Sequence, residues 1–208
     1  MKLSWFRSIR VPLIFSLATF IGLCVASLFP GVAEFVAVPS VPVLKGRGII
    51  DYLTVPVSVA TYSLFPLNIG LWWNVIGAIL LMSLVLRWRL TGQEYVLAFL
   101  IGAVAGGIVF IATAPRAALL GPVPAGYGLI GFYCVSAARN WRGLHWAAKS
   151  YSLLVFAVLP YVVVRAVLGN ADSRFVEAAA FVTAFAVGMK VLRDRRALPT
   201  ESVAESEP

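Results

Sequence analysis

Apolar runs of bilayer length, separated by short polar or basic breaks, make up most of this chain. A helix needs about 20 mostly apolar residues to cross the hydrocarbon core of a membrane. The runs therefore predict an all-α polytopic membrane protein with six transmembrane helices. They cover residues 11–29, 68–86, 94–111, 121–138, 151–168 and 175–192.

Residues 30–65 are also apolar, but they are interrupted by Pro30, Pro39, Pro42 and Pro56. Proline lacks the N–H that a continuous helix uses, so it breaks or kinks a helix interior. Backbone outside a regular helix must find its hydrogen bonds in water or in protein rather than in lipid. We therefore predict a long outer loop that lies at the membrane interface and contains short helical pieces.

The polar ends of the chain flank a membrane domain that we place at residues 11–192. Residues 1–10 are basic, and the apolar run after them is longer than the core of a signal peptide. A retained first helix is therefore expected; a cleaved signal peptide, with a weak site at residues 31–33, is the alternative. Residues 193–208 are polar and end in an acidic stretch, which predicts a disordered cytoplasmic tail.

The composition favours a membrane environment. The chain is 61% hydrophobic and 12% charged, whereas soluble domains carry about 25% charged residues. The net charge of +8 does not indicate nucleic acid as a partner, because the basic residues flank the apolar runs. If the six spans cross the membrane in alternating directions, most of the basic residues fall on one side, together with both termini. The positive-inside rule assigns this side to the cytoplasm. That side carries Lys2, Arg7, Arg10, Arg87, Arg89, Arg139, Arg142, Lys149, Lys190, Arg193, Arg195 and Arg196. We expect a multi-pass protein of the cell membrane (inner or plasma membrane).

Three polar residues within the predicted spans are candidates for a function, because burying them in lipid is costly. Arg165 and Glu177 flank the short loop between the last two helices, so we expect an ion pair that holds two helix ends. The alternatives are contact with a partner helix, or an Arg165 that reaches the headgroups by itself. Asn74 is expected to make an interhelical hydrogen bond, with membership of a site as the alternative.

No catalytic constellation can be assembled from the residues alone. The hydroxyl candidates near the outer face are Ser58, Thr61, Ser63 and Thr113. The single histidine, His145, falls in a cytoplasmic loop, and a Glu177 paired with an arginine would be a poor base.

Metal and redox chemistry find no support in the sequence either. No group of His, Cys, Asp and Glu has ligand spacing, so we expect no metal and no cofactor. Cys24 and Cys134 lie inside apolar runs, where a thiol behaves as a small hydrophobe, and we expect no disulfide.

The string Gly121-Pro-Val-Pro-Ala-Gly-Tyr-Gly-Leu-Ile-Gly131 opens the fourth predicted helix. Its prolines suit a first helical turn, where a missing N–H costs little. The string resembles the start of the catalytic helix in rhomboids, which are intramembrane serine proteases. Gly121 and Tyr127 match the family pattern, but Val123 stands where the family has its nucleophilic serine and Pro124 where it has the neighbouring glycine.

The resemblance extends over roughly residues 51–188. At the second helix, Asn74 matches the family's oxyanion-hole asparagine, while the histidine four residues before it is replaced by Gly70. At the sixth helix, the small residues that end at Gly188 remain, and Glu177 occupies the position of the catalytic histidine. The resemblance therefore implies a rhomboid-like six-helix fold without the Ser/His dyad, and we expect no proteolysis by the family mechanism.

Inactive relatives of this kind bind membrane proteins, so the resemblance implies a pseudoprotease. We expect it to bind transmembrane segments or integral membrane proteins, surrounded by membrane lipid. The vestigial groove would be formed by Asn74, Gly121, Val123, Pro124, Tyr127 and Glu177. One alternative is an accessory or structural subunit of a larger integral membrane complex. A small transporter is the other alternative, but the sequence shows no polar site at the middle of a broken helix.

Overall fold

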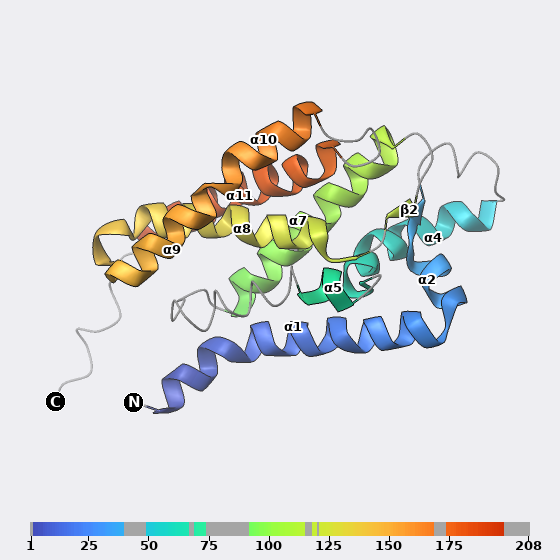
Figure 1. The fold of residues 1–208 in the computed structure, drawn as a ribbon, viewed down its shortest axis with the longest axis horizontal. Coiled ribbons are helices and arrows are strands. Elements are labelled where there is room, and N and C mark those ends of the chain that lie inside the picture. The colour runs from blue at the N-terminus through green and yellow to red at the C-terminus, as the bar shows by residue number, and fades with distance from the viewer. Residues whose placement is uncertain are drawn as a thin grey trace.

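The computed structural model describes residues 2–39, 49–66, 69–73, 92–114, 118–119, 121–168 and 174–197. This part of the chain is mostly helical, as the sequence predicts (Figure 1). Its longer helices are α1 (Lys2–Leu28), α4 (Ile49–Thr61), α7 (Gly92–Thr113), α8 (Val123–Arg139), α9 (Trp146–Phe156), α10 (Val158–Leu168) and α11 (Arg174–Ala197). The short elements are α2 (Pro30–Val36), β1 (Val38–Pro39), η1 (Tyr62–Leu64), α5 (Ile69–Trp72), β2 (Ala118–Leu119) and η3 (Trp141–Gly143).

Two of these helices contain stretches that are long and apolar enough to cross a membrane. They are Arg10–Leu28 in α1 and Gln93–Thr113 in α7. Most of the second predicted helix, residues 68–86, lies outside the described residues. Only its first part is described, and this part contains α5.

The three helices α7, α8 and α11 form the centre of the bundle. A Cβ at Gly102 of α7 would lie 2.7 Å from the Cα of Gly128 in α8, so the two backbones touch. On the other side of α8, a Cβ at Gly131 would collide with the Phe181 carbonyl of α11, and one at Gly188 would lie 3.2 Å from the Phe132 ring. Small residues at these positions permit the close packing on which helix association in lipid depends.

The contacts also fix the helix directions. Residue numbers rise in α7 as they fall in α8, so these two helices are antiparallel. They rise together in α8 and α11, so these two are parallel. The Lys2 end of α1 and the Ala197 end of α11 lie at the same end of the bundle (Figure 1).

The fifth predicted helix, residues 151–168, is divided into α9 and α10 and begins five residues early, at Trp146. The break falls at Ala157. Pro160 explains it, because proline has no N–H to donate to the Phe156 carbonyl four residues earlier. The Tyr133 hydroxyl lies 2.6 Å from Ser152 Oγ, which itself donates to the Ala148 carbonyl, so Tyr133 is the donor that joins α8 to α9.

Helix α1 packs along α7 through aromatic side chains. The Phe15 ring lies 4.7 Å from the Phe99 ring and 5.5 Å from the Tyr95 ring, measured between centroids. The Trp72 indole N–H of α5 donates to Thr19 Oγ1 at 3.0 Å, which joins α5 to α1.

Both predicted polar ends are partly helical. Helix α1 begins at Lys2 rather than at residue 11, and α11 continues to Ala197 rather than ending at residue 192. Lysine and arginine are good helix formers, and cations near the end of α11 also interact favourably with the helix dipole.

The predicted outer loop contains short helical pieces, as expected. We call residues 30–39 and 49–66 the cap; they hold α2 with 7 residues, α4 with 13 residues, and η1. Helix α4 continues through Pro56 instead of stopping there. A two-residue antiparallel pairing of β1 with β2 joins Val38 to Leu119, immediately before α8. The cap therefore lies at the end of the bundle where α7 ends and α8 begins (Figure 1).

Candidate functional site

The start of α8 is held in place by its glycine and prolines. Gly121 has a φ of 106°, a left-handed conformation that glycine adopts without steric cost. Its N–H donates to the Tyr62 carbonyl of the cap at 3.1 Å. Pro122 precedes the first helical residue, and Pro124 lies in the first turn, where the Gly126 N–H donates to the Pro122 carbonyl at 2.8 Å. The prediction that these prolines suit a first turn is confirmed.

Gly106 of α7 is the point where the first turns of α8 and α11 meet. A Cβ there would collide with the Pro124 ring and would lie 3.3 Å from the Val176 side chain. Pro124 follows Val123, and Val176 precedes Glu177. The two positions that the resemblance equates with the nucleophile and the base therefore lie on turns that pack against the same glycine.

These two side chains differ in character and in burial. Val123 is half-buried, whereas Glu177 is only 8% exposed. Glu177 lies in the first turn of α11, where the helix dipole favours a negative charge. Tyr127, one turn further along α8, is half-buried and packs against an apolar cluster between α8, α9 and α11.

Two residues of the predicted site fall outside what the structure describes. Asn74 lies in the range 74–91, none of which is described. The main chain of Arg165 belongs to α10, but its side chain is not described, so its ion pair with Glu177 stays a prediction.

The hydroxyl groups near this end of the bundle are mostly engaged with the backbone. Thr61 donates to the Val57 carbonyl and Thr113 to the Val109 carbonyl, each at 2.7 Å. Ser58 donates to the Phe35 carbonyl at 3.2 Å within the cap.

Ser63 differs, because its Oγ is buried without a hydrogen-bond partner among the described residues. It lacks a histidine base, because the only histidine of the sequence, His145, is exposed in the turn before α9, at the other end of the bundle. Within the described ranges, no three His, Cys, Asp or Glu side chains gather to hold a metal ion. The described side chains provide packing surfaces and backbone contacts at this site rather than an activated nucleophile.

Tyr62 holds the cap to two helices, a role that the sequence did not indicate. Its side chain is fully buried and its hydroxyl donates to the Ala103 carbonyl of α7 at 2.8 Å, while its own carbonyl accepts the Gly121 N–H. Burial raises the pKa of the Tyr62 phenol, so the group remains a neutral donor. A buried tyrosine needs a partner for its hydroxyl, but no sequence signal names that partner.

Comparison with known proteins gives no match. No protein-family model matches the chain, and no curated protein and no solved structure shows significant similarity to it.

Proposed function

We propose that this chain is a multi-pass membrane protein of rhomboid-like architecture that has lost the catalytic dyad and binds transmembrane segments of other membrane proteins. The binding site that we propose is the start of α8. The six spans, the family and the partner class are all parts of this proposal.

The alternation of helix directions supports the six spans. Helices α7, α8, α9–α10 and α11 run alternately from one end of the bundle to the other (Figure 1). A helix rises about 1.5 Å per residue, so the 17 residues of α8 extend over about 26 Å and the 24 of α11 over about 36 Å. Both lengths are compatible with a hydrocarbon core of about 30 Å.

The convergence on Gly106 is the observation that carries the proposal. It brings together the first turns of α8 and α11, which carry the two positions that the proposed resemblance equates with the dyad. Val123 is half-exposed at this point and Pro124 restricts the backbone beside it. An apolar, rigid surface of this kind suits van der Waals contact with a helix, the main source of helix association in lipid.

Without a catalytic dyad, the proposed site could bind a transmembrane segment but could not cleave it by the rhomboid mechanism. Val123 has no nucleophilic atom, and in the proposed resemblance Glu177 takes the position of the family's histidine. A surface that admits a transmembrane segment without cleaving it would release that segment unchanged. We therefore propose recognition, and not hydrolysis, as the function of the site.

The experiment is a pull-down of the tagged protein from native membranes into nanodiscs, read by mass spectrometry. Val123→Trp adds bulk at the start of α8, and Leu17→Trp adds the same ring on the exposed face of α1 as a matched control. We expect membrane-protein partners that Val123→Trp loses and Leu17→Trp retains. Retention of every partner by Val123→Trp would contradict the proposal that the start of α8 is the binding site.

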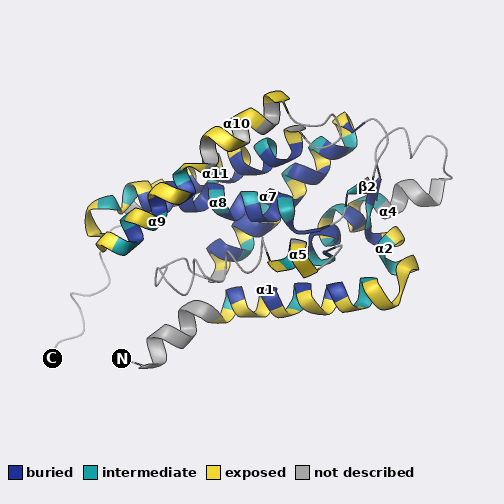
Figure 2. Cartoon of the chain, viewed as in Figure 1, coloured by how far each residue is buried: buried dark blue, intermediate teal, exposed yellow. Residues whose placement is uncertain are grey.

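The exposed face of α1 favours a second candidate, a subunit of a larger membrane complex. This face carries Leu13, Ile14, Leu17, Phe20 and Ile21 (Figure 2). A subunit would bind a partner of fixed stoichiometry there, so Leu17→Trp and not Val123→Trp would release it.

A further inference from the structure

Basic side chains gather at the end of the bundle opposite the cap, where α8 passes through η3 into α9. Arg139 ends α8, Arg142 lies in η3 and Lys149 lies in the first turn of α9. Lys190 and Arg193 belong to α11. We call these five residues the basic cluster. The stretch 139–149 contains no aspartate or glutamate, and Asp194 of α11 is flanked by Arg193, Arg195 and Arg196, so positive charge predominates at this end.

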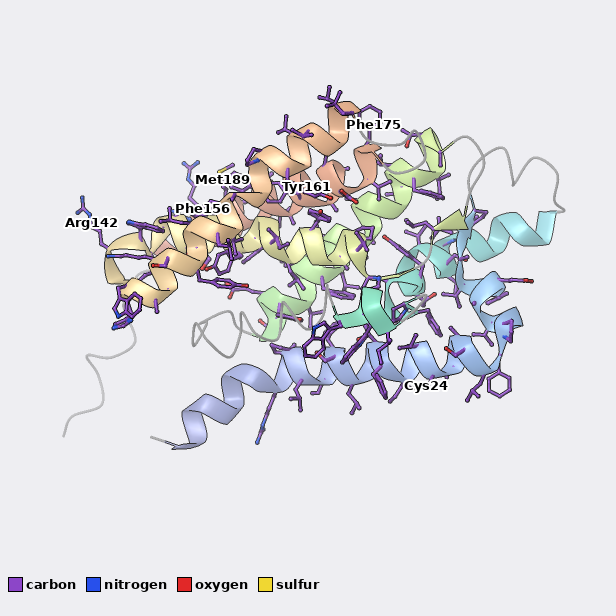
Figure 3. The ribbon with its side chains drawn as sticks, viewed as in Figure 1. Cys24, Arg142, Phe156, Tyr161, Phe175 and Met189 are labelled. Atoms are coloured by element: carbon purple, nitrogen blue, oxygen red, sulfur yellow. The ribbon has the colours of Figure 1, made fainter. Side chains whose placement is uncertain are left out.

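One contact links the α8 and α11 members of the basic cluster, and a second holds η3 in place. The Arg139 guanidinium reaches the Met189 carbonyl of α11 at 3.5 Å, which places the last turn of α8 beside Lys190. The Trp141 ring stacks on the Phe156 ring with centroids 6.1 Å apart, which holds η3 against the end of α9. Arg142 lies at the extreme end of the bundle and points away from the helices (Figure 3).

An exposed apolar stripe begins directly beside the basic cluster. Trp146, Leu153 and Leu154 are exposed at i, i+7 and i+8 along α9, which places them on one helix face. The exposed apolar side chains continue beyond the break at Ala157, and Figure 2 shows exposed residues along both α9 and α10. Residues 146–168 extend over about 35 Å as helix, close to the thickness of the hydrocarbon core.

We propose that the basic cluster binds the phosphate headgroup of an anionic phospholipid whose acyl chains lie along this stripe. Arginine matches the geometry of phosphate oxygens through its planar fork of N–H donors, and basic surfaces at the cytoplasmic ends of membrane helices bind anionic headgroups. A soluble phosphate compound would use the cations alone. Only a lipid uses the stripe as well, and the exposed Trp146 at the start of the stripe suits the interface between headgroups and acyl chains.

This inference requires that the bundle lies in a membrane. It does not require client binding at the start of α8, which is at the opposite end of the bundle (Figure 1). Loss of lipid binding and loss of partner binding are therefore distinguishable results.

The test is native mass spectrometry of the full chain in detergent, titrated with phosphatidylglycerol, phosphatidylcholine or inorganic phosphate. Arg142→Gln/Lys149→Gln removes two cations from the basic cluster. Arg7→Gln/Arg10→Gln removes two cations from α1 at the same end of the bundle and is the matched control. Circular dichroism and size-exclusion chromatography of each variant check that it is folded.

We expect phosphatidylglycerol to bind the wild type about tenfold more tightly than phosphatidylcholine, and the cluster variant to lose about tenfold in affinity. The control variant should retain the wild-type affinity. Equal losses in both double variants would mean that summed charge and not this site attracts the lipid. Equal binding of the two lipids, or displacement of phosphatidylglycerol by inorganic phosphate, would also overturn the proposal.

Discussion

Gly102 and Gly128 bring the backbones of α7 and α8 into direct contact. A Cβ built on Gly102 would lie 2.7 Å from the Cα of Gly128, and one built on Gly128 would lie 2.6 Å from the Ala98 carbonyl oxygen. These neighbours are backbone atoms, which cannot move aside as the end of a flexible side chain can. The position of α8 against α7 therefore depends on glycine at both positions, because neither has a Cβ.

Gly102→Ala should destabilise the bundle by about 1–3 kcal/mol, because overpacking forces the helices apart. Thermal unfolding in detergent would show this as a lower melting temperature. Gly31→Ala is the matched control, since a Cβ at Gly31 of α2 meets nothing within 4 Å. Equal stability of the two variants would contradict the close approach.

Tyr62→Phe removes the hydroxyl that donates to the Ala103 carbonyl, and should lower the free energy of unfolding by about 1 kcal/mol. Tyr161→Phe, at an exposed tyrosine of α10, should have no measurable effect on stability. A Tyr62→Phe protein as stable as the wild type would show that the cap does not depend on this bond.

The pH dependence of stability should also change in Tyr62→Phe. Burial raises the pKa of Tyr62 in the folded state, whereas a tyrosine in the unfolded chain has a pKa of about 10. Below that pH both states keep the proton. As the pH rises above it, only the unfolded state loses the proton, so the stability of the wild type falls. Melting temperatures measured on both sides of this pH should fall less steeply for Tyr62→Phe.

Thr19→Val preserves the shape of the Thr19 side chain and removes the acceptor of the Trp72 indole N–H. We expect a loss of about 1 kcal/mol, together with a change in tryptophan fluorescence. Ser27→Ala on the same helix is the control, because Ser27 donates within its own helix, to the Leu23 carbonyl. If the two substitutions have the same effect, α5 is not anchored to α1 through Thr19.

If the rhomboid-like architecture is right, introducing a serine at position 123 and a histidine at position 177 should create a reactive nucleophile–base pair. We expect a fluorophosphonate probe to label Val123→Ser/Glu177→His and not Val123→Ser alone. The serine oxygen would attack phosphorus, fluoride would leave, and the histidine would take the serine proton. The probe labels covalently, so in-gel fluorescence measures it. Identical labelling of the single and double variants would show that a histidine at position 177 does not act as a base for a serine at position 123, and would contradict the rhomboid-like arrangement.

The helices that the sequence predicted best are those with uninterrupted apolar runs. The predictions at residues 94–111 and 121–138 lie within two residues of the ends of α7 and α8. The break before Pro160 was readable in principle, because proline removes a helical hydrogen bond wherever it stands. It was missed because the apolar run continues unchanged through Ala157.

The contacts of the candidate site were less accessible from sequence. A two-residue strand such as β1 has no periodicity to detect. The pairing of Val38 with Leu119 and the bond from Tyr62 to Ala103 join segments that are distant along the chain. The meeting of Pro124 and Val176 on Gly106 likewise depends on how three helices cross, which local patterns do not encode.

The pairing of β1 with β2 has a consequence for biosynthesis. The cap precedes α7 in the chain. Among the described residues, two backbone ties join it to the segment before α8, from Val38 to Leu119 and from Tyr62 to Gly121, and Leu119 and Gly121 are translated only after α7. A nascent chain that stops after α7 must therefore hold an unclosed cap. Protease sensitivity of this segment should persist in stalled chains and disappear when Gly121 has emerged from the ribosome and α8 has packed against α7.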